Sequence, residues 1–145
     1  MTEKQAQALL DEGYALMAEF GFGSLSGRDR DAVIQKALQV LGAIARAPEI
    51  AAACQAFFLS RKLYEMDGHN GARVLLGDYF ISLAVKLVLP LENRQLLEDL
   101  SLRLKDYAVD SSRYLARFDF DAYLETVDTV CKGYIKSERN ASQRQ

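Results

Sequence analysis

The sequence has few of the residues from which disulfides, zinc sites and catalytic centres are built. Its 145 residues include two cysteines and a single histidine. Cys54 and Cys131 each fall in an apolar helical pattern with no second cysteine or histidine nearby, so we interpret them as small buried hydrophobic residues. His69 lies among turn residues without a nucleophile or an orienting partner beside it, which is typical of a surface loop. These residues therefore predict neither a metal site nor a catalytic residue.

An excess of basic residues is also missing. The chain has 18 Lys and Arg against 20 Asp and Glu, a formal net charge of −2. It therefore lacks the positive field that attracts nucleic acid. Residues 1–7 lack the charged and then apolar pattern of a secretion signal. Together with the two cysteines that have no predicted partner, these features predict a cytoplasmic protein.

Apolar residues at helical spacing are abundant, and no stretch shows the alternation typical of a β-strand. We expect an all-α fold, a single-domain bundle of about six helices over residues 1–136, followed by a polar tail at 137–145 that frays. A chain of this length buries roughly two-thirds of its unfolded surface and needs no disulfide or metal to fold. The expected helices cover approximately residues 2–20, 29–45, 48–64, 71–90 and 92–117, and a last helix, capped by Asp119 or Asp121, carries apolar residues from Tyr123 to Ile135.

The stretch 71–90 is the most apolar helix candidate, with apolar side chains most of the way round it. It approaches the length of a membrane span, about 20 residues. Asp78 and Lys86 argue against a span, because an ionised side chain near the bilayer centre costs at least roughly 2.5–3.5 kcal/mol. Pro90 ends the helix early. We therefore predict a central helix of a soluble protein, covered by its own domain or by a second subunit.

Two carboxylates four residues apart, Asp106 and Asp110, are expected to share one face of a helix. Such a pair can hold Mg²⁺, and a small Mg²⁺ enzyme that uses them is one open interpretation. The basic residues Arg103, Lys105 and Arg113 nearby favour a solvated helix surface instead.

Two segments resemble motifs of one enzyme family. Residues 72–84, Ala-Arg-Val-Leu-Leu-Gly-Asp-Tyr-Phe-Ile-Ser-Leu-Ala, are similar to the A-x-L-x-G-D-Y-L helix of trans-polyprenyl diphosphate synthases. Residues 123–131 are similar to the Y-L-x-x-I-x-x-K-T helix of the same family. The two motifs occur in the family's order, so the resemblance spans roughly residues 50–135 and implies a truncated isoprenoid-synthase fold.

The departures from the family pattern are as informative as the matches. Catalytic members carry a D-D-x-x-D sequence and an R-R-G loop, which hold Mg²⁺ and the allylic diphosphate. The corresponding residues 57–70 contain no aspartate cluster, and Val130 and Cys131 replace the K-T pair. Ionising an allylic diphosphate requires metal ions that neutralise the leaving group. The chain therefore resembles the non-catalytic small subunit of heterodimeric hexaprenyl and heptaprenyl diphosphate synthases, and we expect no independent activity.

The resemblance implies a catalytic large subunit that carries the aspartate-rich motifs and binds Mg²⁺, while this chain binds no cofactor itself and helps to set product length. Family members dimerise through central helices that include the G-D-Y region. We expect the interface with the large subunit to be formed by Leu75, Leu76, Tyr79, Phe80, Leu83 and Leu87. The implied wall of the product tunnel consists of Tyr79, Phe80 and Leu83. The alternative function is a helical protein–protein interaction module, either a homodimer or bound to another protein, that is unrelated to isoprenoid synthesis.

Overall fold

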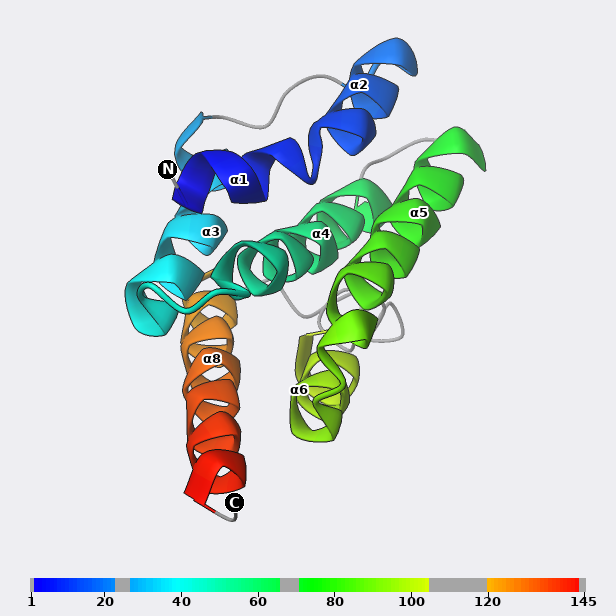
Figure 1. The fold of residues 1–145 in the computed structure, drawn as a ribbon. Helices are drawn as coiled ribbons and strands as arrows, with labels where there is room; N and C mark the ends of the chain where they lie inside the picture. The colour runs from blue at the N-terminus through cyan, green and yellow to red at the C-terminus, as the bar shows by residue number, and fades with distance from the viewer. Residues whose placement is uncertain (1, 23–26, 66–70, 105–119, 144–145) are drawn as a thin grey trace.

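The structure is a computed structural model that describes residues 2–22, 27–65, 71–104 and 120–143 (Figure 1). Within these ranges there are seven α-helices and no strand, which confirms the all-α prediction for this part of the chain and corrects the count of about six. A 3₁₀ turn, η1, follows α5, and a π-helical segment, η2, follows α6. The elements are α1 Thr2–Ala8, α2 Asp11–Glu19, α3 Gly27–Leu41, α4 Ala47–Glu65, α5 Gly71–Val88, η1 Leu89–Leu91, α6 Arg94–Asp99, η2 Leu100–Leu104 and α8 Phe120–Gln143.

The helix expected over residues 2–20 is interrupted between α1 and α2. The backbone turns at Leu9 and Leu10, where the N–H of Leu10 bonds the carbonyl of Gln7. Leu10 is fully buried at this turn. The interruption lets α1 pack on α3 and α4 while α2 reaches α5, which a single straight helix would not do.

The two C-terminal predictions were a helix over residues 92–117 and a polar tail from residue 137. The helix expected over 92–117 is α6 and then η2 as far as Leu104, and residues 105–119 lie outside the described part of the chain. The polar segment expected to fray from residue 137 continues α8 to Gln143. Asn93 helps to hold this part of α8 in place. The side-chain amide of Asn93 donates to Ser137 Oγ at 2.9 Å and to Glu138 Oε1 at 2.8 Å. The same side chain caps α6 by accepting from the N–H of Leu96 at 2.8 Å.

The central helix is α4, and the prediction that residues 71–90 would be central is wrong. Every residue from Ile50 to Ser60 is buried. Figure 1 shows α4 running through the middle of the molecule, and α1, α3, α5 and η2 contact it. Tyr123 of α8 also contacts α4, at Cys54 and Phe58. Its surface is lined by small side chains, so neighbouring helices approach closely on several sides; these are Ala47, Ala51, Ala52, Ala53, Cys54 and Ala56.

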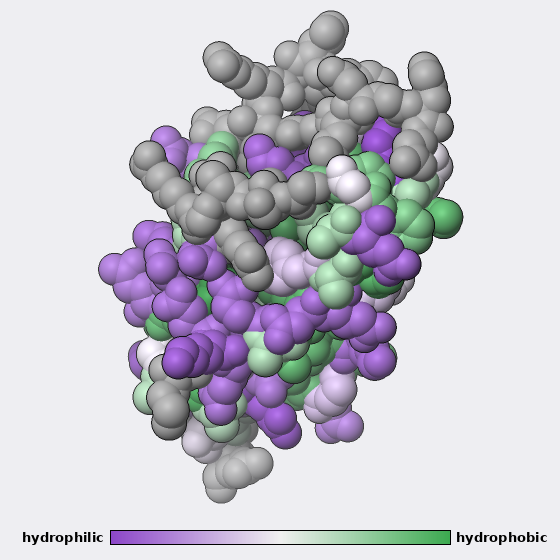
Figure 2. Space-filling model, turned by 90° about the horizontal axis from the view of Figure 1, so that it is seen from above, coloured by the Kyte–Doolittle hydropathy of each residue, from purple (hydrophilic) through white to green (hydrophobic). Residues whose placement is uncertain are grey.

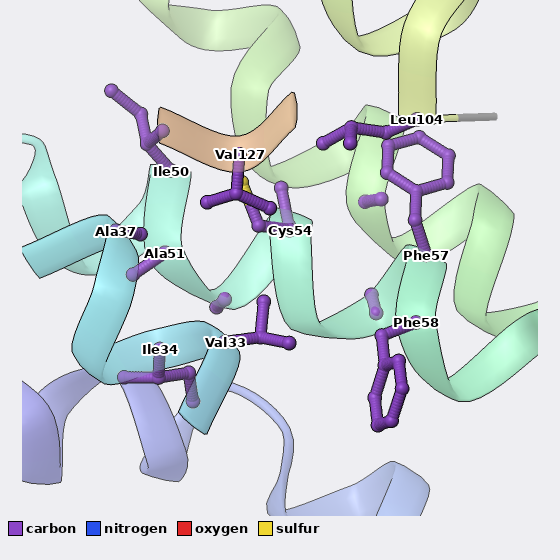
Figure 3. Packing of buried hydrophobic residues seen from close by; sticks show 14 of the residues in the cluster. Val33, Ile34, Ala37, Ile50, Ala51, Cys54, Phe57, Phe58, Leu104 and Val127 are labelled. Carbon is purple, nitrogen blue, oxygen red and sulfur yellow. The ribbon is translucent and has the colours of Figure 1, made fainter. Parts of the chain in front are cut away.

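The core is built around α4 by apolar residues from the helices that surround it. Figure 3 shows Ala37 of α3 beside Ala51 and Val127 of α8 near Cys54. Val33 and Ile34 of α3 belong to the same buried cluster. Leu104 of η2 lies near Phe57 in the same view. The apolar side chains at these positions are removed from water, and this hydrophobic burial is the main favourable contribution to folding.

Candidate interaction surface on α5

The helix with the G-D-Y segment, α5, has a narrow buried face. Its buried residues recur at helical spacing and face the protein interior; they are Leu76, Gly77, Phe80, Ala84 and Val88. The contact between α4 and α5 is the most extensive between any two described elements, while α2 and α6 contact α5 as well. The remaining surface of α5 is partly or fully open to solvent, although many of its residues are apolar.

The Gly77-Asp78 pair attaches α5 to the end of α4 through Tyr64. A Cβ on Gly77 would lie 2.5 Å from a ring carbon of Tyr64, so the ring needs glycine at this position to lie against α5. The Tyr64 hydroxyl donates a hydrogen bond to Asp78 Oδ1. Partial burial, together with this bond and the charge of Asp78, raises the pKa of Tyr64 above its ordinary value. The Gly77-Asp78 pair therefore has a structural role, because it joins α5 to the end of α4. Asp78 itself is exposed, so burial is not the reason for the bond.

Arg73 provides a second attachment to the same helix end. Its guanidinium Nη1 donates to the carbonyl oxygen of Tyr64 at 3.1 Å and lies 3.5 Å from that of Leu63. The last carbonyls of a helix have no partner within the helix, and a cation there also interacts favourably with the helix dipole. Arg73, Gly77 and Asp78 of the family-like segment thus all hold the C-terminal end of α4. Sequence reasoning missed Tyr64, which has no recognisable motif around it.

The aromatic pair Tyr79 and Phe80 packs against α2. The rings lie edge to face with their centroids 5.3 Å apart. A Cβ on Gly13 of α2 would lie 2.4 Å from a ring carbon of Phe80, so glycine is required for this close contact. Burial and the nearby carboxylate of Glu12 raise the pKa of Tyr79. Phe80 is fully buried in this contact, whereas Tyr79 is partly exposed.

The structure divides the six residues expected at the partner interface into three groups. Phe80 and Leu76 are buried in the core of this chain, so neither presents a surface to a partner in this conformation. The side chains of Tyr79, Leu83 and Leu87 are partly buried and pack against the core. Leu75 alone is largely exposed, at 71%. The tunnel role of Tyr79, Phe80 and Leu83 stays a prediction.

The outward face of α5 presents apolar residues that the prediction left out. Val74 is 41% exposed, and Leu89, where η1 begins, is 58% exposed. A shallow hollow runs along the C-terminal half of this face, lined by Ile81, Ser82, Val85, Lys86, Leu89 and Pro90. Figure 2 shows apolar surface on the right-hand side, where α5 lies in Figure 1, next to hydrophilic residues. Exposed apolar patches rimmed by polar residues are typical of interaction surfaces.

By length and composition, residues Gly71–Leu91 also form the one described segment able to cross a membrane. Of the most apolar 18-residue window in this segment, 28% is buried inside the protein. Core helices of soluble proteins meet the same criteria, so the observation is weak evidence for a span. The charged side chains of Asp78 and Lys86 lie on its exposed face.

The second family-like segment, residues 123–131, contributes to the core through α8. The hydroxyl of the fully buried Tyr123 donates to the carbonyl oxygen of Cys54 at 2.7 Å, and burial raises the pKa of this tyrosine. Both cysteines are buried and free, as predicted. The two thiols are nevertheless neighbours in space. A hydrogen bond with the Cys131 thiol, together with burial, raises the pKa of Cys54.

Several residues with predicted roles lie outside the described ranges, namely His69, Asp106 and Asp110. Within the ranges that are described, no three His, Cys, Asp or Glu side chains come together in a group suited to a metal ion. The most distinctive surface of the described chain is therefore the outward face of α5. No protein-family model, curated protein or solved structure matches the chain.

Proposed function

We propose that the chain is a non-catalytic subunit that pairs with a catalytic trans-polyprenyl diphosphate synthase subunit and helps to set the length of its product. The observation that carries the proposal is the surface of α5. This helix bears the G-D-Y segment, and its exposed leucine and valine side chains face away from the core of the chain. An apolar face on a helix that resembles the family's dimerisation helix is suited to a partner helix.

The division of labour follows from the chemistry of prenyl transfer. The catalytic subunit holds Mg²⁺ and the diphosphate on its own aspartate-rich motifs, and this chain supplies packing surface. Burying a large apolar side chain is worth roughly 1.5–3 kcal/mol. Association also costs the conformational entropy of the side chains that become ordered at the interface. Burial of Leu75, Leu89 and the neighbouring Val74 is expected to more than offset this cost.

Product length would be set by apolar side chains next to the growing tail. Leu83 and Tyr79 are partly exposed and are the accessible members of the predicted tunnel wall, whereas Phe80 is enclosed between α2 and α5. We therefore expect Leu83→Ala to lengthen the product in the reconstituted complex. Phe80→Ala has the same expected effect on product length, but the variant also loses core packing, so its stability must be measured in parallel.

The proposal is tested by co-expression with a protein that carries two aspartate-rich motifs and is encoded beside this chain. The two chains should co-purify, and prenyl transfer should require both. Leu75→Glu should weaken the complex at least tenfold. Leu102→Glu is the matched control, because Leu102 is 67% exposed but lies on η2 rather than on α5. Failure of the catalytic candidate to bind, or full activity without this chain, would overturn the proposal.

A second candidate function, an interaction module unrelated to isoprenoids, is favoured by the same exposed face of α5. The two candidates differ in one measurement. An interaction module would leave prenyl transfer by the catalytic candidate unchanged at every ratio of the two chains.

A further inference from the structure

Five solvent-exposed positions on α5 and at the start of η1 form a self-complementary stripe. They follow one another at steps of three or four residues and are Leu75, Asp78, Ser82, Lys86 and Leu89. At 3.6 residues per turn they fall within a sector of about 80° on one side of the helix. Their exposure places the stripe on the side away from α4.

The chemical order of the stripe is symmetric about Ser82. Leu75 and Leu89 stand seven residues on either side of this serine. Asp78 and Lys86 stand four residues on either side of it and have opposite charges. If a second copy packs antiparallel about a two-fold axis at Ser82, each leucine meets a leucine and each carboxylate meets an ammonium group. A small residue at the crossing point also lets the two helix backbones approach.

The charged groups are available for this pairing. The Tyr64 hydroxyl donates to Asp78 Oδ1, and the Asp78 side chain is exposed to solvent. Within the described part of the chain, Lys86 has no carboxylate at ion-pair distance. A parallel arrangement about the same serine would place like charges opposite each other, so the charge pattern favours the antiparallel one.

We propose that a second copy of this chain covers the outward face of α5, in an antiparallel homodimer with its two-fold axis at Ser82. The inference goes beyond the proposed function and does not depend on it, because it uses only the surface of this chain. The stripe is about 21 Å long at 1.5 Å per residue, which is short for a permanent interface. The dimer is therefore expected to be reversible, with dissociation at micromolar concentrations. A catalytic subunit that uses the same face would compete with the second copy.

The test is sedimentation of the full-length chain over a range of concentrations at low ionic strength. The wild-type protein should shift from monomer to dimer as concentration rises. Asp78→Lys and Lys86→Glu should each weaken the dimer at least tenfold, because each places like charges together twice. An equimolar mixture of these two variants should regain the dimer, because every introduced charge then faces an opposite one. Lys86→Arg is the control that keeps the charge and should keep the dimer.

The antiparallel geometry has a separate test by cross-linking with a short bismaleimide. Leu75→Cys and Leu89→Cys should cross-link when mixed, whereas neither variant should cross-link alone. The wild-type chain is the control for Cys54 and Cys131, which are buried. A monomer at all concentrations, a mixture that fails to restore the dimer, or equal cross-linking by the single variants would overturn the proposal. Binding of monomer to neutral phosphatidylcholine vesicles through Leu75 and Leu89 would also overturn it.

Discussion

Helices α4 and α5 pack against each other but relate to solvent in opposite ways. Every residue from Ile50 to Ser60 of α4 is buried, including Gln55 and Ser60. In contrast, α5 buries five residues and exposes Leu75 at 71%, although its sequence is the more apolar. The comparison teaches that the size of the side chains, as well as their hydrophobicity, decides which helix is surrounded. Alanines on several sides of α4 admit neighbouring helices, whereas larger side chains cover most of α5.

The largest expected effect comes from removing a core side chain of α4. Phe57→Ala should lower the free energy of unfolding by about 3–5 kcal/mol, because it removes buried contacts and leaves a cavity. Phe57 is 1% exposed. Leu75→Ala on α5 is the matched change on the open helix and should alter stability by less than about 0.5 kcal/mol. Urea unfolding at low protein concentration, which limits any contribution from association, measures both. Equal decreases in the free energy of unfolding for Phe57→Ala and Leu75→Ala would contradict the conclusion that α4 is surrounded and α5 is open to solvent.

A smaller effect with a pH signature is expected at the contact between α4 and α8. Tyr123→Phe removes the hydrogen bond to the carbonyl of Cys54 and should cost about 1 kcal/mol at neutral pH. Burial raises the pKa of Tyr123 well above its ordinary value of 10.0, so the folded state keeps the phenol protonated at a pH where the unfolded state ionises it. The contribution of Tyr123 to stability is therefore complete below pH 10 and falls above it.

Above pH 10 the wild-type protein should lose up to about 1.4 kcal/mol per pH unit more than the Tyr123→Phe variant. Urea titrations at a series of pH values between neutral and strongly alkaline measure the difference. Identical slopes for the two proteins would show that the Tyr123 hydroxyl is accessible to solvent, against its position in the core.

The smallest effect is expected where α4 and α5 are attached to each other. Tyr64→Phe removes the bond to Asp78 and should cost about 0.5 kcal/mol, because this bond is exposed to solvent. Asp78→Asn keeps an acceptor oxygen and should cost less. A double-mutant cycle with Tyr64→Phe and Asp78→Ala isolates the coupling between the two side chains. A coupling energy of zero would mean that Gly77 and ring packing alone hold the two helices together.

Periodicity was sufficient to predict the helical class and the approximate bounds of α3, α4 and α5. Both cysteines were also correctly expected to be buried. The break between α1 and α2 was missed because Leu9 and Leu10 continue the apolar pattern of the sequence. The break lets α1 pack on α3 and α4 while α2 packs on α5. The spacing of apolar residues along the sequence carries no information about these tertiary contacts.

The candidate site was predicted only in part. The pattern singled out α5, but it assigned Phe80 and Leu76 to a partner interface, and both are buried in the core of this chain. Helical spacing shows which residues share a face of a helix. When a helix has two apolar faces, as α5 has, the spacing does not show which of them packs against the core of the chain. Tyr64 and Gly13 were missed because their roles depend on close contacts between helices that are distant in sequence.

The narrow buried face of α5 has a consequence for how the protein changes over evolutionary time. The buried residues of α5 and its bonds to Tyr64 hold this helix in place, whereas exposed outward positions such as Leu75 contribute little to folding. Substitutions on the outward side can therefore accumulate without loss of the fold, because a substitution at an exposed position usually changes stability by less than about 0.5 kcal/mol. A lineage can in this way exchange one binding partner for another while the α4 core stays unchanged.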